Sequence, residues 1–173
     1  GQNMQKIWLR RGTFRKGSSV PVDSIEHFDL IVHPEDSVAI NLGDLEHGVE
    51  AITCAPITMV RDDELLDRAA ARRRLGVSQD SIVAYVQLGA GKINDIDSEV
   101  RLTVEALKAH AGIEVVLGES LIGDRVQIDV EGIRLLRDFP NALYFNAFDF
   151  TVIAGGYNSF HEVVRFGLPT LFY

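Results

Sequence analysis

The segment 154–173 (AGGYNSFHEVVRFGLPTLFY) holds the residue types best suited to binding chemistry. Gly155–Gly156 follow an apolar run, and because they lack side chains they let a ligand approach the backbone closely. The helix expected after them begins with unpaired N–H groups and a partial positive charge, which favour an anion. Asn158, Ser159 and Glu162 are spaced so that they share one helix face. The pattern therefore predicts a ligand site with an anionic component.

The same residues fit a structural role equally well. Ser159 and Glu162 match the S-x-x-E capping box, in which the two side chains only satisfy N–H groups at a helix start. Both interpretations stay open at this point. His161 and Glu162 begin like the H-E-x-x-H zinc motif, but Arg165 occupies the position of the second histidine, which excludes that motif. None of the five histidines has metal-ligand spacing, and we expect no metal site.

A second candidate is the turn Gly89-Ala90-Gly91, which directly follows another apolar run. The place suits a loop that binds a phosphate or a sugar, and a tight turn without a ligand is the alternative. A Walker loop is excluded, because Val86 stands where it needs glycine and Ile93 where it needs Ser or Thr. A dinucleotide fingerprint needs glycine where Asn94 stands, which disfavours a nicotinamide-dependent dehydrogenase.

Composition narrows the class of protein further. The chain has 173 residues, 46% of them hydrophobic, and a formal net charge of −8, which disfavours a nucleic-acid partner. The single cysteine, Cys54, excludes an intrachain disulfide framework, and we expect it to be a small buried residue. No apolar run reaches the ~18 residues of a membrane helix, and the first residues lack a signal-peptide pattern. We therefore expect a cytoplasmic protein without a transmembrane segment.

Basic residues gather near the N-terminus, at Arg10, Arg11, Arg15 and Lys16. A solvated loop is the default interpretation, and a phosphate or a peripheral membrane surface is the alternative partner. His33 follows an apolar run and precedes a proline, so it is the histidine of most interest.

The elements that must position these residues alternate along the chain. We expect helices over 62–75, over 96–107 and after Gly156, and buried strands over 28–32, 81–88, 113–117, 148–154 and 169–173. Arg72–Arg74 suit the negative end of the first helix, and Phe160, Val163, Val164 and Gly167 would form the core side of the last. Such alternation predicts an α/β fold, a parallel sheet with helices on both faces. A boundary between about residues 45 and 60 divides the chain into domains 1–48 and 49–173.

Residues 50–173 resemble the donor-binding half of the GT-B glycosyltransferases. The branch most like them contains the peptidoglycan N-acetylglucosaminyl transferase and the monogalactosyldiacylglycerol synthases. The family's glycine loop is similar to Gly89–Gly91, and its preceding helix to Ala71–Gly76. Its small-residue turn, Ser/Thr, Glu and Gly-x-Pro pattern matches Gly155, Gly156, Ser159, Glu162, Gly167, Pro169, Leu171 and Phe172.

The resemblance implies a Rossmann-like domain and transfer of a sugar from a nucleoside-diphosphate donor, expected to be UDP-linked. Glu162 would bond the ribose hydroxyls, the backbone of 156–159 would hold the diphosphate, and Gly89–Gly91 would line the sugar or phosphate pocket. The helix dipole would replace a metal ion and no cofactor is expected; the catalytic base usually comes from the other domain, and none is assigned here. Members continue past the last strand into an Asp/Gln loop, so we expect a truncated donor domain, with residues 1–48 a remnant of the acceptor-side domain.

Two other functions share this architecture. A UDP-sugar epimerase has the same fold, and a non-catalytic nucleotide-sugar-binding module would use the same Asn158, Ser159 and Glu162 face. The acceptor of a transferase could be a small molecule, a lipid or a glycan.

Overall fold

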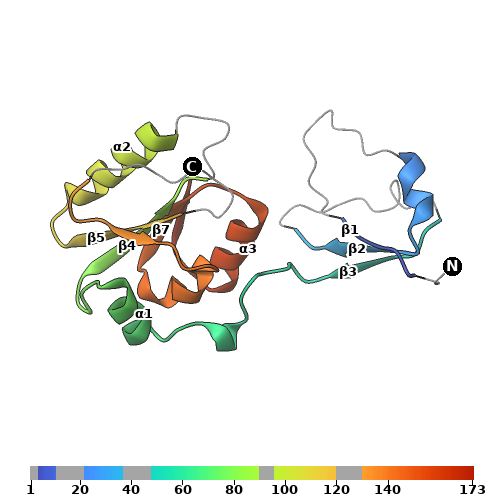
Figure 1. Ribbon diagram of the computed structural model, residues 1–173, viewed down its shortest axis with the longest axis horizontal. Coiled ribbons are helices and arrows are strands. Elements are labelled where there is room, and N and C mark those ends of the chain that lie inside the picture. Colours follow the sequence, from blue (N-terminus) through green and yellow to red (C-terminus); the bar gives the residue numbers. More distant parts are fainter. Residues whose placement is uncertain (1–3, 11–21, 37–47, 90–95, 120–129) are drawn as a thin grey trace. The chain divides into compact units, whose positions relative to one another are not determined.

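The computed structural model describes residues 4–10, 22–36, 48–89, 96–119 and 130–173 (Figure 1). The chain forms two compact units, 1–57 and 58–173. This division lies later than the sequence-based boundary at 48/49, because β3 (Ala51–Cys54) pairs with β2 (Leu30–Pro34) inside the first unit. In the described part of the chain, no helix is long and apolar enough to span a membrane.

The first unit is built on a small parallel sheet. β1 (Ile7–Leu9), β2 and β3 are hydrogen-bonded in that order, and a 3-10 helix, Val22–His27, precedes β2. The strand expected over 28–32 corresponds to β2, which begins and ends two residues later, so that Pro34 is its last residue and lies opposite Cys54. A strand's terminal position tolerates proline because the missing N–H breaks no interior hydrogen bond.

The second unit confirms the predicted parallel α/β architecture. Its five-stranded sheet has the order β6-β5-β4-β7-β8, with every neighbouring pair parallel. The three central strands β5, β4 and β7 are largely apolar and buried, as in sheets covered on both faces, whereas the edge strands β6 and β8 are mostly exposed. Their bounds are β4 Ile82–Gln87, β5 Ile113–Gly118, β6 Arg134–Leu136, β7 Phe150–Ile153 and β8 Thr170–Phe172.

Helices lie on both sides of this sheet (Figure 1). α2 (Ile96–Lys108) packs Val100 and Val104 against one face. α1 (Arg68–Leu75), α3 (Tyr157–Arg165) and the 3-10 helix Asn141–Ala147 share a core cluster with alternate residues of β4 and with Ile153. Val163 of α3 is 2% exposed, as expected, whereas Val164 is 61% exposed, so the prediction for Val164 was wrong. The buried stretch of α3 is 161–163, which turns Val164 away from the sheet.

The helix expected over 62–75 is two separate elements. A 3-10 turn covers Asp62–Glu64, and α1 begins after Asp67, whose carboxylate accepts a hydrogen bond from Ala70 N at 2.8 Å. This N-cap restarts the chain as an α-helix three residues beyond the first turn. Gly76, in the left-handed region at φ 69°, ends α1 as predicted.

The position of Arg72 in the last turn of α1 suggested a charge at the surface, but the side chain is buried. Its side chain is 0% exposed, and its guanidinium donates to the carbonyls of Ala147, Ser78, Gln79 and Ser81. Its Nη2 also lies 2.8 Å from Asp149 Oδ2. Arg72 therefore joins α1 to the loop that precedes β4 and to the segment that precedes β7. Sequence periodicity could not reveal these contacts.

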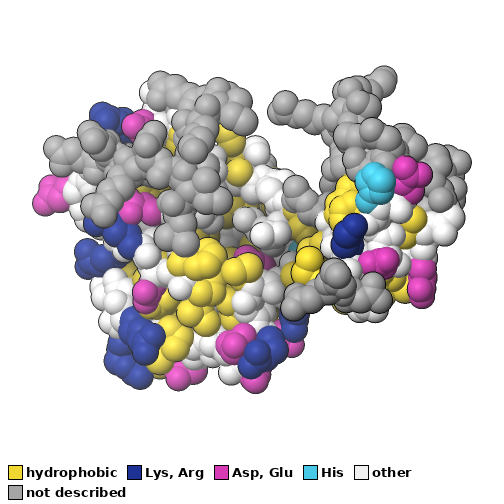
Figure 2. All heavy atoms as spheres, turned by 45° about the vertical axis from the view of Figure 1, so that its right-hand side comes forward, with side chains coloured by type: hydrophobic (Ala, Val, Ile, Leu, Met, Phe, Trp, Pro, Cys, Tyr) yellow, Lys and Arg dark blue, Asp and Glu magenta, His cyan; other side chains and the backbone are white. Residues whose placement is uncertain are grey.

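The surface of the second unit carries mixed charges. On the face shown in Figure 2, Lys and Arg side chains lie among Asp and Glu.

The basic cluster expected near the N-terminus lies outside the described residues except for Arg10. The Arg10 residue is 2% exposed, and its guanidinium lies 4.9 Å from the Trp8 ring centroid.

Candidate functional site

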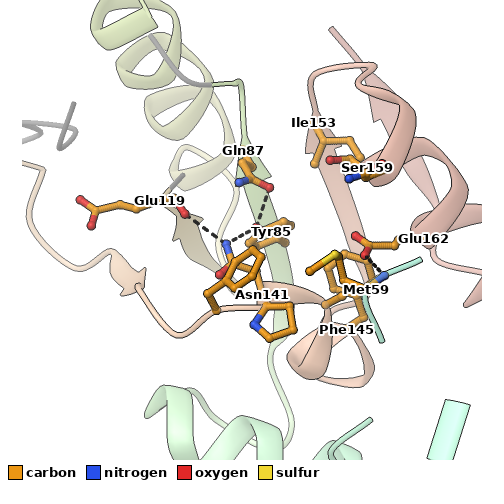
Figure 3. Close-up of a pocket in the computed structure, with 13 residues that line it drawn as sticks. Met59, Tyr85, Gln87, Glu119, Asn141, Phe145, Ile153, Ser159 and Glu162 are labelled. Carbon is orange, nitrogen blue, oxygen red and sulfur yellow. Dashed lines mark hydrogen bonds between the residues drawn. The ribbon is translucent and has the colours of Figure 1, made fainter. Parts of the chain in front are cut away.

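A cavity of about 370 Å³ opens in the second unit at the carboxyl ends of the central strands (Figure 3). β5 lies on one side of β4 and β7 on the other, so the order of connection reverses between β4 and β7. Open parallel sheets bind ligands outside the carboxyl ends of strands at such a reversal. Gln87 ends β4 and Ile153 ends β7, and both line the cavity.

The lining combines apolar side chains with a few polar groups, as in small-molecule sites. The apolar members are Met59, Phe139, Pro140, Ala142, Phe145 and Ile153. The polar members are Tyr85, Gln87, Glu119, Asn141, Asn158, Ser159 and Glu162. The sequence-predicted group Asn158, Ser159 and Glu162 is therefore brought together on α3, at one side of the cavity.

Glu162 is a buried carboxylate with part of its bonding capacity unused. Its residue is 8% exposed, and its Oε1 accepts a hydrogen bond from Met59 N at 3.1 Å (Figure 3). Burial raises the pKa of the Glu162 carboxyl, and the Met59 N–H offsets part of that rise. Among the described residues Oε2 has no hydrogen-bond partner, so it can accept from the hydroxyls of a ligand.

The capping-box interpretation of Ser159 and Glu162 was wrong. α3 begins after Gly156, whose backbone is extended at φ −70° and ψ 148°. Ser159 therefore lies within the first turn rather than at the N-cap, and Glu162 lies beyond that turn. The helix starts earlier than the capping motif requires, because the glycine pair ends the strand and α3 follows it directly.

Gly89 and Ala154, which precedes the pair Gly155–Gly156, lie close together at the carboxyl ends of β4 and β7. Gly89 adopts φ 108°, a region that favours glycine, and a Cβ there would lie 3.8 Å from Ala154 Cβ, next to Gly155. A Cβ at Gly156 would meet no atom of the described residues within 4 Å, so these residues leave the space beside the start of α3 open. These glycines are not among the residues that line the cavity, and Ala90 and Gly91 lie outside the described residues.

Sequence reasoning missed the polar residues opposite α3. Tyr85 donates to Gln87 Oε1 at 2.9 Å, and Asn141 Nδ2 donates to the Tyr85 hydroxyl at 2.9 Å (Figure 3). Glu119 lies beside them and pairs with Arg137 at 2.6 Å. Gln87 could have been noticed, because it is a polar residue at the end of an apolar strand; Asn141 offers no such signal.

Packing holds the Tyr85 side chain of this polar group in place. It is 1% exposed, its ring stacks on Phe148 with centroids 4.8 Å apart, and burial raises its pKa, with the Glu162 carboxylate adding to the rise. The hydroxyl is therefore a permanent donor at neutral pH. Gly118, at the end of β5, must be glycine, because a Cβ there would approach Tyr85 Cε2 to 2.6 Å.

The remaining candidates belong to the first unit. In the first unit, His33 is 1% exposed and its Nδ1 lies 3.2 Å from the Arg10 carbonyl oxygen, while Cys54 is a half-buried free thiol. Within the described ranges, no three His, Cys, Asp or Glu side chains are placed to hold one metal ion.

The parallel pairing and strand order define the second unit as an α/β Rossmann-like sheet. No protein-family model and no curated protein matches the chain. Among solved structures, the chain is similar to the spinosyn forosaminyltransferase SpnP, with a TM-score of 0.47 and 14% sequence identity. The match covers 84% of this chain and 36% of that protein.

Proposed function

We propose that the second unit binds the nucleoside diphosphate part of a sugar donor, UDP-linked, for a glycosyltransferase reaction. The observation that carries the proposal is the position of the buried Glu162 carboxylate, in a cavity at the β4/β7 reversal and one to two turns from the glycine start of α3. The GT-B resemblance of the sequence supports it, because that family places a glutamate on ribose at this point of its motif.

In this proposal each part of the donor has its own binding group. Glu162 Oε2 accepts from ribose hydroxyls, with Asn158 and Ser159 beside it on α3. The diphosphate lies at the start of α3, where Gly156 leaves the approach to the backbone open. The helix dipole then stabilises the negative charge that develops on the nucleoside diphosphate as the bond to the sugar breaks. The acceptor and the catalytic base are not assigned to this unit.

Titration of UDP by calorimetry, in the presence of a chelator, tests the proposal. We expect metal-independent binding by the unmodified chain and a loss of at least about tenfold in affinity for Glu162→Ala, the value of a hydrogen bond to a charged group. Glu105→Ala, which removes an exposed carboxylate from α2, is the matched control and should bind UDP normally.

Two results would contradict the proposal. One is the absence of UDP binding by the folded chain with and without added magnesium or manganese. The other is unchanged UDP affinity in Glu162→Ala, with only the melting temperature lowered, which would mean that Glu162 serves solely to hold Met59.

A further inference from the structure

The donor and the acceptor can be assigned in each hydrogen bond among the polar residues opposite α3, which are Tyr85, Gln87 and Asn141. The Glu119 carbonyl oxygen can only accept, so the Asn141 atom 3.4 Å from it is the amide nitrogen Nδ2. The same Nδ2 donates to the Tyr85 hydroxyl, which leaves the hydroxyl hydrogen for Gln87 Oε1 (Figure 3). The donors therefore run in one direction, from Asn141 through Tyr85 to Gln87.

This direction leaves one acceptor and one donor beside the cavity. Asn141 Oδ1 and Gln87 Nε2 have no hydrogen-bond partner among the described residues, and both residues line the cavity. Neither amide can turn over without breaking a bond to Tyr85, and the buried, stacked Tyr85 ring cannot move to restore it. The pair is thus a preset acceptor and donor.

The charge of the cavity indicates which part of a nucleotide can reach this pair. Among the described residues, no Lys or Arg side chain lines the cavity, and its charged side chains are Glu119, which pairs with Arg137, and Glu162. The Glu162 carboxylate opposes a phosphate, whereas Met59, Pro140 and Phe145 offer apolar surface to a flat uncharged ring. A nucleobase fits these requirements.

We propose that Asn141 and Gln87 select uracil over cytosine. Asn141 Oδ1 accepts from the ring N3–H, and Gln87 Nε2 donates to the adjacent C4 oxygen. Cytosine presents the reverse, an unprotonated N3 and an amino group at C4, so both contacts become repulsive and leave polar groups unpaired. This inference rests on the proposed function, because it places the base of the same ligand.

Calorimetric titration of the full chain with UDP and with CDP measures the selection, because both ligands share ribose and diphosphate. We expect the unmodified chain to bind UDP at least about tenfold more tightly than CDP. Gln87→Glu turns the donor into an acceptor, so UDP affinity falls, CDP affinity rises relative to it, and the ratio drops to one or below. Gln79→Glu adds the same charge at an exposed position and should leave the ratio unchanged.

Tyr85→Phe provides the second variant, because it keeps the stacked ring and removes only the hydroxyl that orients Gln87. Its UDP-to-CDP ratio should also fall toward one, with near-ultraviolet circular dichroism unchanged. A ratio near one in the unmodified chain, or an equal loss for both nucleotides in Gln87→Glu together with an unchanged ratio in Tyr85→Phe, overturns base selection and leaves the proposed function standing. Failure of the unmodified chain to bind either nucleotide overturns both.

Discussion

The two oxygens of the Glu162 carboxylate have separate roles in the proposed site. Its Oε1 holds the Met59 backbone, and the proposed ligand contact falls to Oε2. Burial without a cationic partner is costly, so the group is expected to gain from hydroxyl donors that a ligand brings. Removing Glu162 would also remove the hydrogen bond to the Met59 N–H, which costs about 0.5–1.5 kcal/mol of folding free energy because Met59 is 53% exposed and water can replace the carboxylate. Stability and affinity must therefore be measured separately in every variant at this position.

The raised pKa of Glu162 predicts opposite pH trends for stability and affinity. Between the ordinary carboxyl pKa and the raised one, the folded state keeps a proton that the unfolded state has released, so the Glu162 contribution to stability falls as pH rises through this range. Uridine affinity should instead rise over the same range, because the ionised carboxylate is the stronger acceptor. Denaturation and calorimetry from mildly acidic to neutral pH measure the two trends.

Glu162→Gln is the control for this prediction, because its amide does not titrate. It should flatten both pH trends, apart from those of other groups. A uridine affinity that is independent of pH in the unmodified chain would show that the carboxylate does not contact the ligand.

At the scale of the element, the start of α3 is the proposed site of the diphosphate, separate from the proposed sites of the ribose and the base. Gly156 has φ −70°, so alanine adopts its backbone without strain, and the added Cβ meets no protein atom within 4 Å. We therefore expect Gly156→Ala to fold normally and to weaken UDP more than uridine, because the Cβ fills the approach to the N–H groups that would hold the diphosphate. Parallel titrations of both ligands measure this difference.

Gly112→Ala cannot serve as the comparison, because Gly112 has φ 89° and its substitution is strained. Ala154→Ser, just before the glycine pair, is the better control for a small change at this strand end. Equal losses of UDP and uridine affinity in Gly156→Ala would place the diphosphate elsewhere.

Arg72 shows how one helix residue supports the sheet that carries the cavity. It is buried, bonded to several carbonyls and paired with Asp149, so Arg72→Met should lower the free energy of unfolding by about 3–5 kcal/mol, the usual effect of breaking a buried pair. The neighbouring Arg73 is exposed, and Arg73→Met should change stability by no more than about 0.5 kcal/mol. Urea denaturation measures both, and similar values for the two variants would contradict the structural role of Arg72.

At the scale of the whole molecule, the sequence was sufficient to predict the parallel sheet and the α3 side of the cavity. Continuous apolar strands and strand–helix alternation were sufficient for the parallel sheet of the second unit, and helical spacing was sufficient to place Asn158, Ser159 and Glu162 together. The other side of the cavity, with Tyr85 and Asn141, comes from segments far apart in the chain. Their meeting depends on tertiary packing, for which a local pattern carries no signal.

The same limit explains the errors. Arg72 has the position of a helix-end charge, and only the packing of α1 on Asp149 and on the following loop buries it. The predicted boundary region, about residues 45 to 60, contains the division at 57/58 but left open on which side β3 lies, because the pairing of β3 with β2 is a contact across many intervening residues. Ser159 and Glu162 match a capping motif in sequence, but the N-cap of α3 is Gly156, three residues before Ser159.

The contact between Glu162 and ribose is the central claim, and a double-mutant cycle between protein and ligand tests it most directly. UDP and its 2′,3′-dideoxy analogue are titrated into the unmodified chain and into Glu162→Ala. We expect the removal of the hydroxyls to cost the unmodified chain at least about tenfold in affinity and to cost Glu162→Ala little, because the partner is already absent. An equal loss in both proteins would show that the ribose hydroxyls and Glu162 do not interact.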